Sequence, residues 1–236
     1  MLISLPHIVS YFIIIVTAFF VGNYFLAPLC FSTLQKRRIG RFFIALIVAM
    51  LTYLMAGNWN LWFIIPVVFA GNIVFDFFPA ATAQAWLRRE GLRLLTCAAV
   101  AFLYSVLANV TVPQLLLKVI MLIGGGLGAV FYVGEFIGLA TSELAAKNEL
   151  SWQGLKSGGL WIGRLERFLI FVFILMNNPA GVGFLIAAKS ILRFSESRAD
   201  QRIAEYVLVG TLLSFALAIV ISWGTQRGIL YLSTIR

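Results

Sequence analysis

Long apolar segments recur along the whole chain, and only short polar loops separate them. Hydrophobic residues make up 61% of the 236 residues and charged residues 11%, against about 25% charged residues in a typical soluble domain. A soluble fold could not bury that much apolar surface, whereas a bilayer core about 30 Å thick needs roughly 20 apolar residues per spanning helix. The sequence therefore predicts an all-α fold, a polytopic transmembrane helix bundle that forms one domain over residues 1–236.

The polar loops between the apolar segments predict about eight spans. The start of the chain lacks the basic region of a cleaved signal peptide, so we expect the first apolar segment to stay as a helix. The predicted spans cover residues 7–31, 42–57, 61–78, 94–110, 115–141, 161–176, 182–194 and 206–223.

The sixth and seventh predicted spans form a short hairpin around Pro179. Glu166 lies 13 residues before Pro179 and Arg193 lies 14 residues after it. At 1.5 Å per residue each arm reaches roughly 20 Å, which is less than a full crossing. Two alternatives stay open: residues 161–165 extend the first arm, or the hairpin is re-entrant and buried in protein.

The net charge of +9 is distributed unevenly between the two predicted sides of the membrane. Of 18 lysines and arginines, 15 fall in alternate loops, and only Lys118, Arg227 and Arg236 fall on the other side. Cytoplasmic loops carry the excess of cations, so we expect a bacterial inner-membrane protein with both termini outside. The cations do not gather with aromatic residues into a nucleic-acid surface, so the bilayer is the expected partner.

Four polar residues fall at similar depth within the predicted spans, toward the cytoplasmic side: Asn23, Asn72, Asp76 and Glu135. Because polar groups in a bilayer are costly, they predict a polar layer inside the bundle. Such a layer can bind a solute, an ion or a proton, or it can join helices by hydrogen bonds. The second interpretation is favoured for the two asparagines, and neither is favoured for the two acids.

Small residues recur at helical spacing in the fifth predicted span. Gly124, Gly128, Glu135, Gly138 and Ser142 fall roughly along one stripe of an ideal helix. Such a stripe with a carboxylate can line a pore, but more often it lets a neighbouring helix approach closely. Helix packing is therefore the favoured interpretation.

A second group of charged residues lies near the base of the hairpin and the start of the last predicted span. It consists of Glu166, Arg167, Lys189, Arg193 and Glu205. The hairpin register predicts that Glu166 lies level with Arg193 and that Lys189 lies about one turn deeper. The group forms either an interfacial clamp that closes the hairpin, which is favoured, or an anion or partner site on the cytoplasmic face.

The chain offers few residues for catalysis or metal binding. His7 is the only histidine, and Cys30 and Cys97 have no histidine nearby, so we expect no metal site, no disulfide and no cofactor. Nucleophile, phosphate-loop and dinucleotide motifs are also missing from the sequence.

Three runs in the C-terminal half resemble a known family: GLWIGRLER at 159–167, GFLIAAKSILRF at 183–194 and AEYVLVGTLLSF at 204–215. They are similar to the bacterial membrane-protein family called domain of unknown function 3307. That family carries two His-x-x-x-Asp patterns. In this chain the first pattern corresponds to Phe19 and Asn23, and the second corresponds to Asn72 and Asp76. Both histidines and one acid are missing, so the resemblance implies membrane location and fold more than activity, and it implies that any metal site has been lost.

Three classes of function follow. The favoured one is a non-enzymatic membrane subunit or scaffold for a homo-oligomer or a partner, for instance in a bacterial membrane-stress or phage-defence module. Its docking surface would be the cytoplasmic face with Trp152, Lys156 and Arg164. One alternative is a transporter or channel that uses Asp76 and Glu135. The other is an intramembrane enzyme, the least favoured of the three classes, because a single acid without His or Cys supports little acid–base or metal chemistry.

Overall fold

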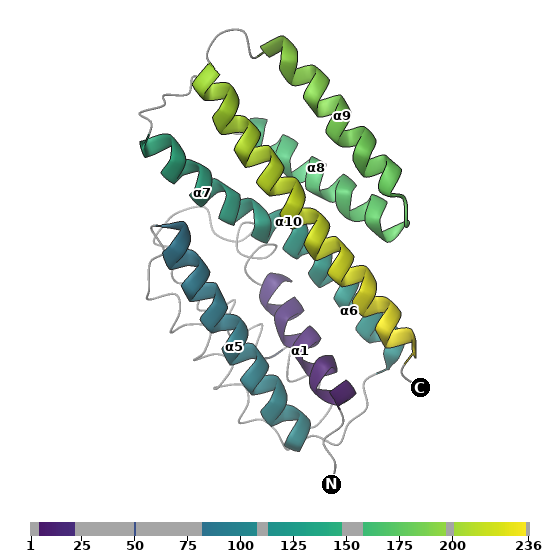
Figure 1. Ribbon diagram of the computed structural model, residues 1–236. Coiled ribbons are helices and arrows are strands. Elements are labelled where there is room, and N and C mark those ends of the chain that lie inside the picture. The colour runs from purple at the N-terminus through teal and green to yellow at the C-terminus, as the bar shows by residue number, and fades with distance from the viewer. Residues whose placement is uncertain are drawn as a thin grey trace. The chain divides into compact units, whose positions relative to one another are not determined.

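The computed structural model describes residues 5–21, 50, 82–107, 113–147, 158–196 and 201–234 (Figure 1). None of these ranges contains a strand, so the prediction of an all-α fold is confirmed for the described part. The elements are α1 (Leu5–Phe20), α5 (Ala83–Leu107), α6 (Gln114–Leu127), the π-helix η3 (Gly128–Tyr132), α7 (Val133–Lys147), α8 (Gly158–Leu175), α9 (Pro179–Glu196) and α10 (Gln201–Thr234).

Two helical stretches in the described residues are long and apolar enough to cross a membrane. They are Gln114–Ser142 and Tyr206–Thr234, each of 29 residues, and at 1.5 Å per residue each exceeds the roughly 30 Å of a hydrocarbon core. They correspond to the fifth and eighth predicted spans. The apolar part of α9, Pro179–Ile191, is shorter. The second and third predicted spans lie outside the described residues, apart from Met50.

The chain divides into two compact units, the first of which comprises Met1–Leu127 and Gly228–Arg236. In this unit α1 packs against both α5 and α6. The Thr17 hydroxyl donates a hydrogen bond to the carbonyl of Ile120 at 3.2 Å. A Cβ atom on Gly124 would lie 2.2 Å from Thr17 Oγ1, so only glycine allows α1 and α6 to approach this closely. The packing interpretation of the small residues is therefore confirmed at Gly124.

Helix α5 begins at Ala83, although the sequence analysis placed a loop before a span that starts at residue 94. Thr82 caps the helix, because its hydroxyl accepts a hydrogen bond from the amide of Ala85 at 3.1 Å. The charged residues then continue the helix rather than leave it. Glu90 is buried and accepts hydrogen bonds from Arg89 at 3.0 Å and Arg93 at 3.1 Å. The pairing of Glu90 with two arginines lets these charged residues lie within the helix.

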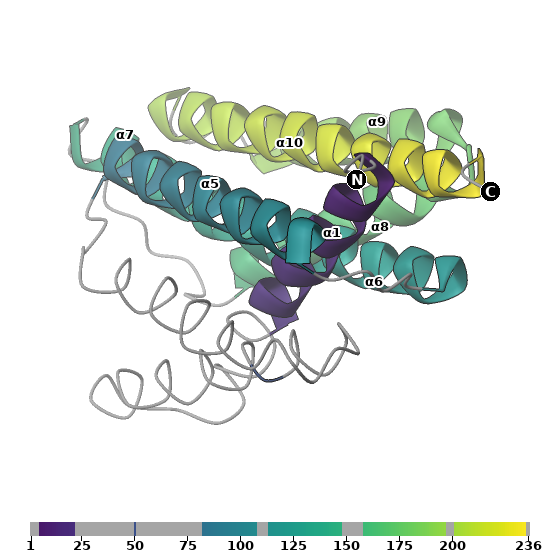
Figure 2. The ribbon, with the colours of Figure 1, turned by 90° about the horizontal axis from the view of Figure 1, so that it is seen from below.

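The second unit, Gly128–Arg227, contains η3, α7, α8, α9 and most of α10. Helices α8 and α9 form an antiparallel hairpin, and α10 runs alongside it (Figures 1 and 2). Its core contains Ile170, Val182, Phe215 and Ala218. Gln226 Nε2 also donates a hydrogen bond to the carbonyl of Ile174 at 2.8 Å, which joins α10 to the end of α8.

The hairpin turn lies at Asn177 and Asn178, before Pro179. Asn177 has a φ of 54°, and its amide bonds the carbonyl of Ile174 at 3.0 Å while the Asn178 amide bonds the carbonyl of Phe173 at 2.8 Å. This pair of bonds is a Schellman C-cap. Asn178 then caps α9 through its side-chain oxygen, and Pro179 is the first residue of that helix.

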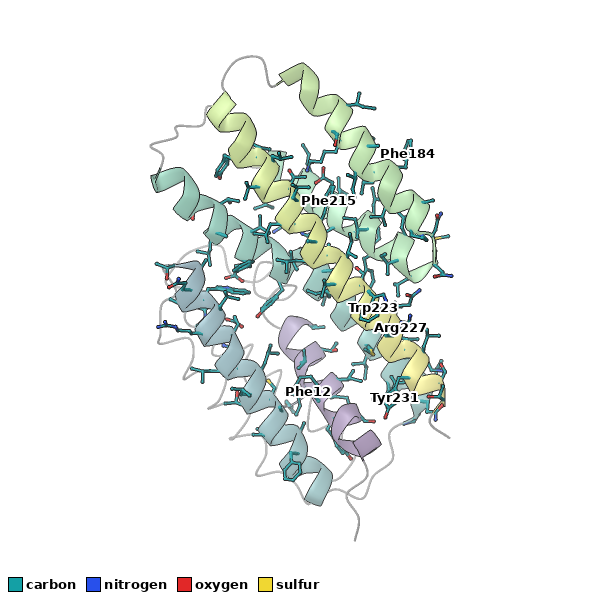
Figure 3. All side chains as sticks on the ribbon, viewed as in Figure 1. Phe12, Phe184, Phe215, Trp223, Arg227 and Tyr231 are labelled. Atoms are coloured by element: carbon teal, nitrogen blue, oxygen red, sulfur yellow. The ribbon has the colours of Figure 1, made fainter. Side chains whose placement is uncertain are left out.

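Large apolar side chains lie exposed on the outer faces of the second unit. They include Trp161, Leu165 and Phe168 on α8 and Phe184 on α9, whose side chain points away from α10 (Figure 3). Glu166 and Arg167 lie between Leu165 and Phe168 in the sequence, but their side chains are buried. An apolar exterior around buried charge is the distribution expected in lipid rather than in water.

Candidate functional site

The charged residues of the second unit meet between its helices and form the candidate site. Glu166 on α8 forms an ion pair with Lys189 on α9, through Oε2 and Nζ. The side chain of Glu166 is 12% exposed and that of Lys189 is 26% exposed. The Lys189 ammonium also lies 5.2 Å from the centre of the Phe215 ring on α10, which adds a cation–π attraction. Phe215 lies on the side of α10 toward the hairpin (Figure 3).

This pair corrects the predicted register, in which Glu166 lay level with Arg193 and Lys189 was free for another partner. The prediction took Pro179 as the turn, whereas the structure turns at Asn177 and Asn178. Moving the turn toward the N-terminus moves the residue opposite Glu166 back by about one helical turn, from Arg193 to Lys189. The hairpin clamp thus forms with a different cation.

Arg167 is buried and turns away from Glu166 toward two other helical segments. Its Nε donates a hydrogen bond to the carbonyl of Val130 in η3 at 2.9 Å, and Nη1 donates one to Ser214 Oγ on α10 at 3.1 Å. A π-helix interrupts the regular i→i−4 ladder, and the arginine bonds a carbonyl inside that interruption. One side chain therefore joins η3, α8 and α10.

Two glycines make room for the guanidinium of Arg167. A Cβ on Gly134 would lie 2.5 Å from Nη2, and a Cβ on Gly163 would lie 3.2 Å from Nη1. Contact with Gly163 on the same helix shows that the side chain runs back toward the start of α8. Any larger residue at position 134 would displace the arginine.

Arg164 lies one turn earlier on α8 and is half-buried. Its guanidinium carbon lies 5.0 Å from the ring centre of Phe131 in η3 and 5.2 Å from that of Trp161. Both distances are within the range of cation–π attraction. Two rings from different elements therefore restrict this cation.

The predicted polar layer is described at one residue only. Asn23, Asn72 and Asp76 lie outside the described residues, so the layer stays a prediction. Glu135 lies on α7 and is exposed, as are Gly138 and Ser142.

The last three residues of the predicted small-residue stripe are exposed because the π-helix η3 interrupts the helix before them. Gly124 and Gly128 are buried, whereas Glu135 and the residues after it on the stripe are exposed. An ideal helix turns about 100° per residue. The π-helix at Gly128–Tyr132 changes this phase, so the stripe drawn on an ideal helix does not stay on one face.

Of the predicted charged cluster, the structure brings Glu166 and Lys189 together and directs Arg167 elsewhere. Arg193 and Glu205 belong to α9 and α10, but their side chains lie outside the described part. Ser214 and the Val130 carbonyl, both partners of Arg167, were not predicted from the sequence. Ser214 is one of three serines in α10, and nothing in the residue types distinguished it from the others or indicated the carbonyl.

The geometry holds helices together and keeps a guanidinium accessible at Arg164. The described residues are helical apart from turns, carry an apolar exterior and include two helices long and apolar enough to cross a membrane, which supports association with a membrane. In comparisons with known proteins, no protein-family model, no curated protein and no solved structure matches the chain.

Proposed function

We propose that the chain is an integral membrane protein of the bacterial inner membrane that crosses the bilayer about eight times, with both termini outside. The two long apolar helices, the exposed apolar faces of α8, α9 and α10 and the uneven distribution of cations support this location.

Reporter fusions test this topology directly. A cytoplasm-active reporter after Arg236 should be silent, and the same reporter inserted within residues 148–157 should be active. An alkaline extraction that leaves the chain in the membrane pellet should accompany these results. The opposite reporter pattern would refute the topology while leaving the membrane location intact.

Within the membrane, we propose a non-enzymatic subunit or scaffold that acts through a homo-oligomer or a protein partner. The observation that carries this proposal is that the buried charged side chains of the second unit join its helices to one another. Glu166 and Lys189 close the hairpin, and Arg167 joins three helical segments through a carbonyl and a hydroxyl. Charges engaged in this way stabilise a fixed arrangement of helices, as a scaffold requires.

The test compares assembly with transport. Native mass spectrometry of the chain in lipid nanodiscs should show a defined homo-oligomer or a stoichiometric partner from its own membrane. Proteoliposomes assayed for proton, potassium and anion flux should behave like empty liposomes. Flux that disappears on Asp76→Asn or Glu135→Gln substitution would instead establish the transporter alternative.

A further inference from the structure

Arg164 differs from its described neighbours Arg167 and Lys189 in how its side chain is used. Two rings, Phe131 and Trp161, restrict its guanidinium from different elements. Among the residues that the structure describes, no hydrogen bond or ion pair joins this side chain to an acceptor. A guanidinium has five N–H donors in a planar fork, so a fixed and half-buried donor group is left available.

The charge balance around Arg164 favours an anion. Lys189 is paired with Glu166, and Arg167 bonds only neutral oxygen atoms of Val130 and Ser214. Neither Arg164 nor Arg167 forms an ion pair with a described carboxylate. Arg167 is 5% exposed and closed to ligands, so the positive potential of both arginines is accessible at Arg164.

The position of Arg164 along α8 matches a bilayer boundary. It lies six residues after the first residue of the helix, Gly158, which is about 9 Å along the axis. Trp161 is 60% exposed, and its neighbours Leu160 and Ile162 are exposed as well. An exposed tryptophan and a cation surrounded by exposed aliphatic side chains are typical of the headgroup level of a membrane.

We propose that Arg164, held by Trp161 and Phe131, binds the phosphate of an anionic phospholipid headgroup at the cytoplasmic boundary. The planar fork fits two phosphate oxygens, and the exposed side chains around it contact the acyl chains of the same lipid. Anionic lipids give a cytoplasmic membrane surface a negative potential, which attracts cations that lie close to it. This inference rests on the proposed membrane location.

The experiment measures lipid retention by the full chain. The protein is purified in detergent with equal amounts of phosphatidylglycerol and phosphatidylcholine, and the lipids that remain bound are counted by native mass spectrometry. The wild-type chain should retain phosphatidylglycerol in preference, because both headgroups carry a phosphate but the choline cation of phosphatidylcholine offsets its charge and competes with Arg164. Arg164→Gln should lower that preference by about tenfold, the change that loss of one charge-assisted contact of about 1.4 kcal/mol produces.

Two further variants separate the proposed contact from general charge. Arg88→Gln removes an equal charge from an exposed residue of α5 and should leave the preference unchanged. Trp161→Leu keeps the charge of Arg164 but removes one of its rings, and it should weaken retention severalfold. The second variant also supports the inference if Arg164→Gln fails to fold.

Several results would overturn the inference. Equal retention of both lipids, or an equal loss of preference in Arg88→Gln, would mean that no specific site exists. Binding of inorganic phosphate with the same dependence on Arg164 would assign the site to a soluble ion, and a protein seated on Arg164 in place of lipid would make it a docking surface. Alkaline extraction distinguishes the two failures, because a chain released from the membrane refutes the proposed location itself.

Discussion

Loss of the Glu166–Lys189 pair should destabilise the protein by an amount that the structure sets. Removing one partner of a buried pair costs about 3–5 kcal/mol, because the other charge stays buried. The side chains are 12% and 26% exposed, so water reaches Lys189 in part and we expect about 2–3 kcal/mol. For a chain of this size this lowers the Tm by about 4–12 °C.

The assay measures the Tm of the full chain in lipid nanodiscs. The amount of folded protein that remains after heating to each temperature is determined by gel filtration. Glu166→Gln and Lys189→Gln should each lower the Tm within that range. The double variant should lose less than the two single variants together, because it leaves no unpaired charge. Exchanging the two residues, Glu166→Lys with Lys189→Glu, should recover part of the loss.

Arg193 provides the comparison that can refute this reasoning. If the register in the structure holds, Arg193→Gln lowers the Tm less than Lys189→Gln does. Glu149→Gln, in a segment outside the described residues, serves as the charge control and should have a smaller effect than Glu166→Gln. Additive losses in the double variant, or a larger loss at Arg193 than at Lys189, would show that Glu166 and Lys189 are not coupled.

Two further predictions use glycine and asparagine positions and are checked by the same Tm measurement. Gly134→Ala should lower the Tm, because the added Cβ would lie 2.5 Å from Arg167 Nη2. In the control variant Gly138→Ala the added Cβ meets nothing within 4 Å, so the Tm should not change. Equal effects of the two variants would argue against the arginine site. Asn177→Val should cost about 1–2 kcal/mol, because its φ of 54° disfavours a β-branched residue, whereas Asn177→Gly should be tolerated.

The helical class and the hairpin of the second unit could be predicted from the sequence because both follow from local patterns. Apolar segments indicated α8 and α9, and Pro179 indicated the connection between them. The start of α5 was misplaced because Arg89, Glu90 and Arg93 were counted as loop charges. The pairing of Glu90 with Arg93 at helical spacing, and with its neighbour Arg89, allows the helix to continue.

The register of the hairpin shows how a small local error changes a site. The predicted hairpin was centred on Pro179, but the first helical position accepts proline readily, so Pro179 belongs to the second helix. Asparagine tolerates the left-handed conformation and also caps helices well, so two asparagines before a proline are enough to end one helix and begin the next. Applied to residues 177–179, this logic places the turn earlier and pairs Glu166 with Lys189.

The partners of Arg167 required the structure because they depend on a backbone irregularity. No residue type distinguishes the π-helix at Gly128–Tyr132 from an ordinary helix, yet it places the Val130 carbonyl where the guanidinium can bond it. The surrounding small residues were visible in the sequence, but they belong to different segments: Gly134 follows η3, and Ser214 lies in the last helix. Small residues at separate places in an apolar chain can thus mark a buried arginine, because its guanidinium needs both space and acceptors.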